Sequence, residues 1–292
     1  MSYNNFLGQD GFIWFTAVVE DRQDPAKLGR VRVRCLGYHT DDKIVLPTSS
    51  LPWAHVLLPI TSSGISGIGQ SPLGLLEGSW VFGFFRDSLH KQEPVIMGSL
   101  PGRPSESAKT SKGFYDPNGV YPKYIDEPDT NRLAVNNADK EAPSLTARKA
   151  DRITNIVGVN NTWAQPEISY NAVYPFNHVY ESESGHVLEF DDTTDAKRIH
   201  LRHTSGTSIE MTNNGDQIEI TKNNRYILVT ADNKVYIKGT KDVVIDGNYD
   251  LKINGNYNIE VAGNKTETIS GTKTSNTTGA VIHRGSTIDL NP

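Results

Sequence analysis

Residues 235–279 read VYIKGTKDVVIDGNYDLKINGNYNIEVAGNKTETISGTKTSNTTG, and they repeat one pattern every eight residues. Glycine recurs six times at that interval, at Gly239, Gly247, Gly255, Gly263, Gly271 and Gly279. One aliphatic pair precedes each of the first four glycines: Val235 and Ile237, Val243 and Ile245, Leu251 and Ile253, and Ile259 and Val261. An apolar residue at every second position is typical of a strand with one buried face. Glycine permits a bend that a side chain would resist, so each octad predicts one short strand and one corner.

One octad cannot bury its apolar face by itself, whereas stacked octads can. Octads this short leave few residues for the corners of a single-chain solenoid, and an unpaired strand edge is an aggregation hazard. We therefore predict that three identical chains wind together into a triangular prism, a triple-stranded intertwined β-helix. Strand spacings of about 4.8 Å give six such layers a length of roughly 29 Å.

The last octads depart from the pattern, because Glu267 and Ser275 take positions that are aliphatic earlier, and Lys265 and Lys273 share their parity. Charged side chains on a threefold axis are costly unless they are paired or bind ions. One interpretation is a polar lower shaft that holds water or ions. The other, which we favour because such side chains are rarely buried, is a shifted register in which they face solvent.

The N-terminal part predicts a small β-barrel. Strands are expected at 12–20, 29–37, 52–58, 80–85 and 94–100. Five short strands with glycine and proline between them, and no helical periodicity, favour an OB-fold. The predicted domains are an OB-fold docking domain at 1–103, an extended linker at 104–174, and a spike at 175–292 with octads from about 227.

The linker is rich in proline, asparagine, aspartate and serine, and a short helix is expected near 144–152. Alternation of apolar and polar residues then returns at 178–182, 185–190, 198–203, 208–211, 217–221 and 225–230. The fold class is thus all-β.

Composition narrows the function. The chain has 292 residues and a net charge of −5, which argues against a nucleic-acid partner because phosphate contacts dominate such binding. The single cysteine, Cys35, excludes an intrachain disulfide and is expected to be a small buried side chain. No run approaches the roughly 20 apolar residues that span a bilayer, and no secretory leader is expected.

Three arginines, Arg30, Arg32 and Arg34, alternate with small apolar residues on the strand at 29–37. They predict either a docking site for a hub protein or salt bridges to Glu20, Asp21 and Asp24. Binding of single-stranded nucleic acid is disfavoured, because no aromatic residues for base stacking interleave with them.

No catalytic, cofactor or metal site is predicted. His200 and His203 fall on opposite faces of a strand, so their rings cannot share a metal ion. Acidic residues gather at Glu181, Glu183, Glu189, Asp191 and Asp192. We interpret Glu181 and Glu183 as the solvent side of a strand rather than as a glycosidase pair, because no pocket-forming loops accompany them.

Several segments resemble a known family. Residues 16–34 (TAVVEDRQDPAKLGRVRVR), 52–74 (PWAHVLLPITSSGISGIGQSPLG) and 113–122 (GFYDPNGVYP) resemble the N-terminal OB domain of central spike proteins from T-even-like contractile phage tails. Residues 174–193 (YPFNHVYESESGHVLEFDDT) and 198–211 (RIHLRHTSGTSIEM) resemble the start of the spike in that family and in VgrG proteins of type VI secretion. The octads resemble the family's C-terminal β-helix.

The departures from that family also matter. T-even spike proteins carry a lysozyme domain between the OB domain and the β-helix, and the corresponding gap here is too short and lacks its motif. VgrG proteins carry a hub domain ahead of the OB domain, whereas an OB strand begins this chain almost at once. A separate hub protein is therefore expected, and a phage tail is favoured.

The resemblance implies a homotrimeric structural protein, the baseplate hub and central spike of a contractile tail in the virion, assembled in the host cytoplasm. The barrels would dock on a trimeric hub ring protein, and the shaft would puncture the host outer membrane mechanically, without enzymatic activity. A PAAR-type tip protein would cap an apolar end formed by Val281, Ile282, Ile288 and Leu290. His283 stands alone there, without the H-x-H motif of metal-tipped spikes.

Two other functions remain open. The first is a spike with peptidoglycan-cleaving activity in residues 101–174, and the second is a receptor-binding tail adhesin. The octads carry little aromatic surface for stacking on sugars, which argues against the adhesin.

Overall fold

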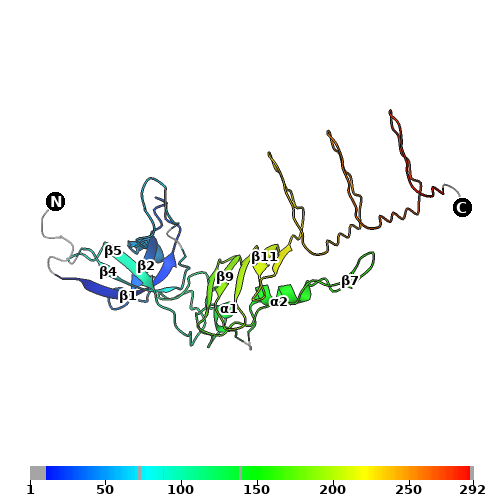
Figure 1. Cartoon of the computed structure of the whole chain (residues 1–292). Coiled ribbons are helices and arrows are strands. Elements are labelled where there is room, and N and C mark those ends of the chain that lie inside the picture. Colours follow the sequence, from blue (N-terminus) through cyan, green and yellow to red (C-terminus); the bar gives the residue numbers. More distant parts are fainter. Residues whose placement is uncertain (1–10, 72–73, 88, 138–139, 290–292) are drawn as a thin grey trace. The chain divides into compact units, whose positions relative to one another are not determined.

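The computed structural model describes residues 11–71, 74–87, 89–137 and 140–289 (Figure 1). Strands dominate these residues, and the chain divides into two units, Met1–Lys241 and Asp242–Pro292. Among the described residues, no helix has the length and apolar character needed to cross a bilayer.

The first part of the larger unit is a closed barrel of five strands in the order β1-β2-β3-β5-β4. The strands are β1 (Ile13–Asp21), β2 (Val31–Cys35), β3 (Trp53–Val56), β4 (Trp80–Phe85) and β5 (Pro94–Ser99). Strands β3 and β5 pair in parallel, and the other neighbours are antiparallel. All five strands expected from the sequence are present, and the closed barrel is consistent with an OB-fold.

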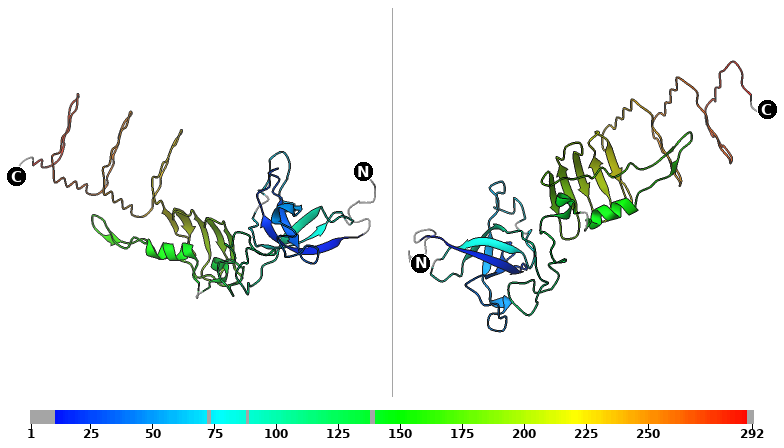
Figure 2. Two further views of the ribbon diagram at one scale, coloured as in Figure 1. Left: turned by 180° about the vertical axis from the view of Figure 1, so that it is seen from behind. Right: turned by 90° about the horizontal axis from the view of Figure 1, so that it is seen from below.

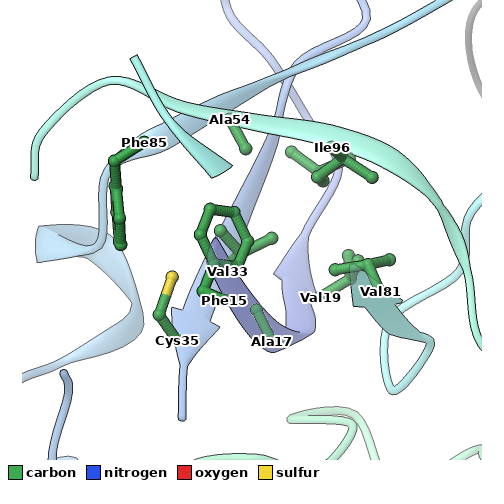
Figure 3. Close-up of a cluster of buried hydrophobic side chains, with 10 residues drawn as sticks. Phe15, Ala17, Val19, Val33, Cys35, Ala54, Val81, Phe85 and Ile96 are labelled. Carbon is green, nitrogen blue, oxygen red and sulfur yellow. The ribbon is translucent and has the colours of Figure 1, made fainter. Parts of the chain in front are cut away.

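Alternation along the strands fills the barrel with apolar side chains, as Figure 3 shows. Phe15, Ala17 and Val19 of β1 and Val33 and Cys35 of β2 point into this core and are almost fully buried. The prediction that Cys35 is a small buried residue is confirmed, and burial raises the pKa of its thiol to about 12. At Gly83 the chain of β5 passes so close that an added Cβ would lie 2.0 Å from the carbonyl oxygen of Val95.

The segment between the barrel and the second sheet contains helices α1 (Arg132–Val135) and α2 (Pro143–Ala150). Helix α2 confirms the short helix expected near 144–152. A narrow hairpin, formed by β6 (Ile156–Val157) and β7 (Thr162–Trp163), follows α2.

A second sheet is an antiparallel meander of five strands in the order β12-β11-β10-β9-β8. Its strands are β8 (Asn177–Glu181), β9 (Val187–Asp191), β10 (Arg198–Arg202), β11 (Ser208–Met211) and β12 (Gln217–Ile220). Helices α1 and α2 lie against one face of it, where Leu133, Leu145 and Val187 form a small apolar cluster (Figure 2).

The octads form no strand in the single chain, and the strand expected at 225–230 is also absent, because residues 221–289 make no ladder hydrogen bonds. Their backbone bends at every eighth residue, from 222–223 through 230–231 and 238–239 to 278–279. All six repeat glycines lie at these bends, at the positions where the sequence predicts corners. In the smaller unit the chain winds as an open spiral whose successive turns stand apart (Figures 1 and 2).

Candidate assembly interface

The arginine row of β2 is largely engaged within the barrel. Asp24 receives two hydrogen bonds from the Arg30 guanidinium, at 2.7 and 3.1 Å, and Arg32 Nε lies 3.5 Å from Asp21. Arg34 donates to both oxygens of Glu20, at 2.6 and 3.1 Å, and both side chains are fully buried. The predicted salt bridges are thus confirmed.

Arg34 cannot contribute to a docking surface, because no part of its side chain reaches solvent. Burial raises the pKa of Glu20, but hydrogen bonds from Arg34 and Thr48 outweigh this, so its pKa lies below the ordinary value. The hydrogen bonds from Arg30 lower the pKa of Asp24 in the same way. Arg30 and Arg32 remain partly exposed, and the Arg32 guanidinium stacks on Trp53 of β3, 4.4 Å from the ring centre. This aromatic residue comes from the neighbouring strand, so the strand's own sequence did not reveal it.

Ion pairs and a hydrogen bond centred on Arg22 and Glu183 connect the barrel to the second sheet. Arg22, just after β1, donates to Glu183 at 2.8 Å, and its Nε lies 3.2 Å from Glu77. Tyr121 from the connecting segment donates to the same Glu183 at 3.2 Å. The solvent-side interpretation therefore fits Glu183, which is exposed, whereas Glu181 is half-buried and accepts a hydrogen bond from Asn131.

The helix-covered face of the second sheet is charged. Glu189 of β9 is fully buried and accepts hydrogen bonds from Arg198 at 2.6 Å and from Asn177 at 3.0 Å, and its other oxygen lies 2.8 Å from His200 Nδ1. His200 is buried on this face while His203 is exposed, in keeping with their opposite parity. The described residues contain no cluster of three potential metal ligands.

A second carboxylate, Glu210 of β11, extends this buried network. It accepts hydrogen bonds from Ser169 at 2.7 Å and from Arg148 of α2, and it lies 3.6 Å from Arg198. Burial raises the pKa of Glu210. The positive charge of Arg148 and the hydrogen bond from the Ser169 hydroxyl outweigh burial, so the pKa lies below its ordinary value and the carboxylate stays ionised at neutral pH. The network fixes helix α2 to the sheet through charge pairs.

The opposite face of the same sheet is apolar and exposed. Two cross-strand rows build it, with Leu188, Leu201 and Ile209 in register in one row and Phe190, Ile199 and Met211 in the other. Tyr180 of β8 extends the first row. Leu201 is 55 % exposed and Phe190 48 % exposed, although a sheet normally buries its apolar face. A contiguous apolar surface of this kind marks a contact with another molecule.

The octads share this character. Their paired aliphatic side chains, from Val235 and Ile237 to Ile259 and Val261, are all exposed in the single chain. An added Cβ at any of the six repeat glycines would have no atom within 4 Å, and none of the six has a positive φ. The need for glycine therefore does not come from the chain's own contacts.

At the far end, Val281, Ile282 and Ile288 are exposed, and Leu290 lies outside the described residues. Glu267 pairs with Lys273 at 2.6 Å and with Lys265 at 3.7 Å. Glu267 breaks the aliphatic pattern, and within one chain the two lysines, which share its parity, neutralise its charge.

Sequence reasoning missed the polarity of the second sheet. The alternation in 187–191 and 198–202 gives two faces but does not tell which one is covered, and the buried face is the charged one. The signal that could have found it lies outside the strands, in Arg148 and Ser169 of the connecting segment, which supply partners for the buried carboxylates.

The comparisons with known proteins fit this geometry. Residues 37–174 match the family described as the Gp5 N-terminal OB domain, and residues 247–270 match the Gp5 C-terminal repeat in three copies. The OB-domain match begins after β2 and extends past the barrel to the start of the second sheet. Neither match is to a lysozyme domain.

Two relatives align well. The chain is 38 % identical to Protein Gp5 of Vibrio phage KVP40 over 271 residues, which covers 82 % of this chain and 64 % of the relative. It is 46 % identical over 125 residues to the pre-baseplate central spike protein Gp5 of Enterobacteria phage T4, covering 41 % of this chain and 21 % of that protein. The chain thus spans less than two thirds of the length of these relatives.

Proposed function

We propose that this chain is the central spike of a contractile phage tail, built from three copies. It is similar to the Gp5 proteins of two phages, and it matches the Gp5 N-terminal OB domain and the Gp5 C-terminal repeat. The barrels dock on a trimeric hub ring protein of the baseplate. The octads of three copies wind into a shaft that pierces the host envelope when the sheath contracts.

The observation that carries this proposal is the unfinished surface of the single chain. Its second sheet exposes six apolar side chains on one face, Tyr180, Phe190, Ile199, Leu201, Ile209 and Met211, around the half-buried Leu188, and its octads leave their strand hydrogen bonds unmade. In the proposed trimer, neighbouring copies supply the missing strand hydrogen bonds of the octads and bury the apolar face of the second sheet. Interlocked strands also suit a piercing role, because they cannot separate one contact at a time.

The shaft works mechanically and needs no chemistry on the envelope. Several carboxylates of residues 101–174, where a hidden hydrolase would have to lie, are engaged in ion pairs, including Glu127 with Arg132 at 2.6 Å. We place the protein in the tail baseplate of the virion, assembled in the host cytoplasm, with a PAAR-type protein on the tip.

The proposal is tested by measuring the mass of the purified full chain in solution by light scattering, and then by electrophoresis in detergent without heating. A trimer that resists detergent until it is boiled is the expected result. A monomer at micromolar concentration would contradict the proposal. Clearing of peptidoglycan in a zymogram, by the full chain, would favour the enzymatic alternative instead.

A further inference from the structure

The hairpin after helix α2 extends away from the second sheet (Figures 1 and 2). Residues 153–165, ITNIVGVNNTWAQ, form a protruding arm closed by the β6–β7 pairs Ile156 with Trp163 and Val157 with Thr162. The arm contains no charged residue, although 22 % of the whole chain is charged.

The arm also exposes its apolar side chains. Val159 at the tip is 96 % exposed, Val157 is 64 % exposed, and Trp163 is 42 % exposed. A hairpin of two short strands is at best marginally stable in water without a surface to pack on. We therefore expect a partner to cover it.

Contacts at its base fix where the arm points. Arg152 donates to the carbonyl oxygen of Gln165 at 2.8 Å, and Asp151 lies 3.2 Å from Lys222, just after β12. A small cavity between α2 and the sheet is lined by Gln165 together with Ile218 and Ile220 of β12. From there the arm extends beyond β12, the strand that leads into the octads (Figures 1 and 2).

The octads carry apolar residues that could match those of the arm. They stand at the position midway between the two aliphatic residues of an octad, and on an extended strand the side chain at this middle position faces the opposite side from the aliphatic pair. This position is apolar only in the first three octads and polar in the later ones, as the series Leu228, Tyr236, Val244, Lys252, Glu260, Thr268 and Asn276 shows. At this position, the outward surface of the proposed shaft is therefore apolar only in the first three octads, which directly follow the second sheet in the sequence.

We propose that the arm of each copy packs on the outward face of the first octads of its neighbours, through Val157, Val159 and Trp163 against Leu228 and Tyr236. The inference rests on the proposed threefold shaft. In that shaft each face stacks a first, a second and a third octad from three different copies, a height of about 14 Å at the usual strand spacing. Each limb of the arm, about six residues long, spans about 20 Å, which is enough to cross all three.

Cross-linking of the full chain tests this contact. Val159→Cys is combined with Leu228→Cys or with Tyr236→Cys, and a short bis-maleimide is added. Cys35 is buried in the barrel core and does not compete. The matched control is Val159→Cys with Lys252→Cys, because residue 252 has the same place in its octad but lies one octad beyond the apolar stretch. Light scattering on each variant reports whether the trimer is present.

Covalent dimers and trimers with residue 228 or 236, at a yield at least fivefold above the control pair, are the expected result. A trimer that gives no cross-link, equal yield in the control, or only a linkage within one copy would overturn the arm contact and leave the trimer standing. Loss of the trimer in every variant and in the unmodified chain would overturn the proposed function and the arm with it.

A second pair of variants separates packing from added charge. Val157→Asp with Val159→Asp is expected to speed dissociation of the trimer in detergent at least tenfold. Thr154→Asp with Asn160→Asp adds the same charge at polar positions of the arm and is expected to dissociate at the unmodified rate. Equal rates for the two pairs would overturn the proposal.

Discussion

Glu189 and Arg34 are fully buried charges, and at the residue scale each is stabilised by several hydrogen bonds rather than by one ion pair. Arg34 donates to Glu20 and to the carbonyl oxygens of Thr40 and Leu46. Removing one partner of such a group leaves a buried charge uncompensated, which typically costs about 3–5 kcal/mol. The two networks therefore make the barrel and the second sheet sensitive to substitution at sites far from any interface.

His200 gives the network around Glu189 a pH dependence. Burial lowers its pKa, the hydrogen bond to Glu189 opposes this, and the nearby charges of Arg148 and Arg198 add to the lowering, so the net shift is downward. A histidine with a depressed pKa in the folded state stabilises the fold above its unfolded pKa of about 6.5, and this contribution is lost as pH falls. Glu189 and Glu210 act in a separate, more acidic range, because their pKa values lie below 4.5.

We expect His200→Asn to flatten the dependence of the free energy of unfolding on pH between about 7 and 5. Urea titrations of the full chain at several pH values measure this. His203→Asn is the control, because His203 is exposed, and it should keep the original slope. Identical slopes for the unmodified chain and His200→Asn would contradict the assignment.

Gly83 limits the barrel in a different way. Because a Cβ at this position would overlap the carbonyl oxygen of Val95, Gly83→Ala must push β4 and β5 apart at their bulge. Overpacking of this kind costs about 1–3 kcal/mol, and thermal unfolding should show a lower midpoint. Gly98→Ala on β5 is the control, because its Cβ would meet no atom within 4 Å. If Gly98→Ala lowered the midpoint of thermal unfolding as much as Gly83→Ala does, the steric explanation would be disproved.

At the scale of elements, the second sheet buries its charged face and exposes its apolar face, as expected of a sheet that packs against another molecule. Its charged face is covered by α1, α2 and the connecting segment of the same chain, and its apolar face is exposed, to be covered by other copies in the proposed trimer. This arrangement favours association of the single chain with a partner. Each Å² of apolar surface that a neighbour covers on the rows of Leu201 and Ile199 contributes about 25 cal/mol of favourable free energy.

Leu201→Asp tests this polarity. The carboxylate would replace a side chain between Leu188 and Ile209, in the middle of the face that neighbouring copies cover in the proposed trimer. Because burying an unpaired charge costs several kcal/mol in each copy, we expect the trimer to dissociate at concentrations at which the unmodified chain stays assembled. Sedimentation equilibrium measures this. Gln217→Asp, on an edge strand of the same face, should remain trimeric, and an assembled Leu201→Asp would refute the interface.

The sequence predicts most elements of this fold but not which faces are covered. All barrel strands and β8 to β12 follow from alternation and turn residues, and the bends follow from the repeat glycines. The hairpin at β6 and β7 was not predicted, because strands of two residues carry no periodicity. The burial of Glu189 was not predicted either, since its partners Arg198 and Asn177 lie on other strands and a pattern within one strand cannot show them.

The candidate interface was predictable in the octads and less so elsewhere. Two aliphatic residues per octad identify a surface that needs partners, whatever the single chain does. The arginine row was harder to interpret, because alternation placed three arginines together but could not tell that Arg34 turns inward toward Glu20. Its acidic partners at positions 20, 21 and 24 were the useful signal.

At the scale of the whole molecule, the bend at every eighth residue makes each octad an interchangeable unit. In the proposed threefold shaft one octad carries the chain from one face to the next, a rotation of one third of a turn. Deleting residues 248–255, one complete octad, should therefore leave a detergent-resistant trimer. Deleting residues 248–251 should abolish it, because three residues instead of seven would then separate Gly247 from Gly255, too few to cross one face of the shaft. Electrophoresis without heating distinguishes the two, and survival of both deletions would argue against the regular winding.

This regular spacing has an evolutionary consequence. A one-third turn is itself a symmetry operation of a threefold object, so the gain or loss of one repeat in the gene moves everything beyond it onto an equivalent orientation. In-frame slippage between neighbouring repeats can then lengthen or shorten the needle in small steps without compensating changes elsewhere. Selection for envelopes of different thickness could act on repeat number alone.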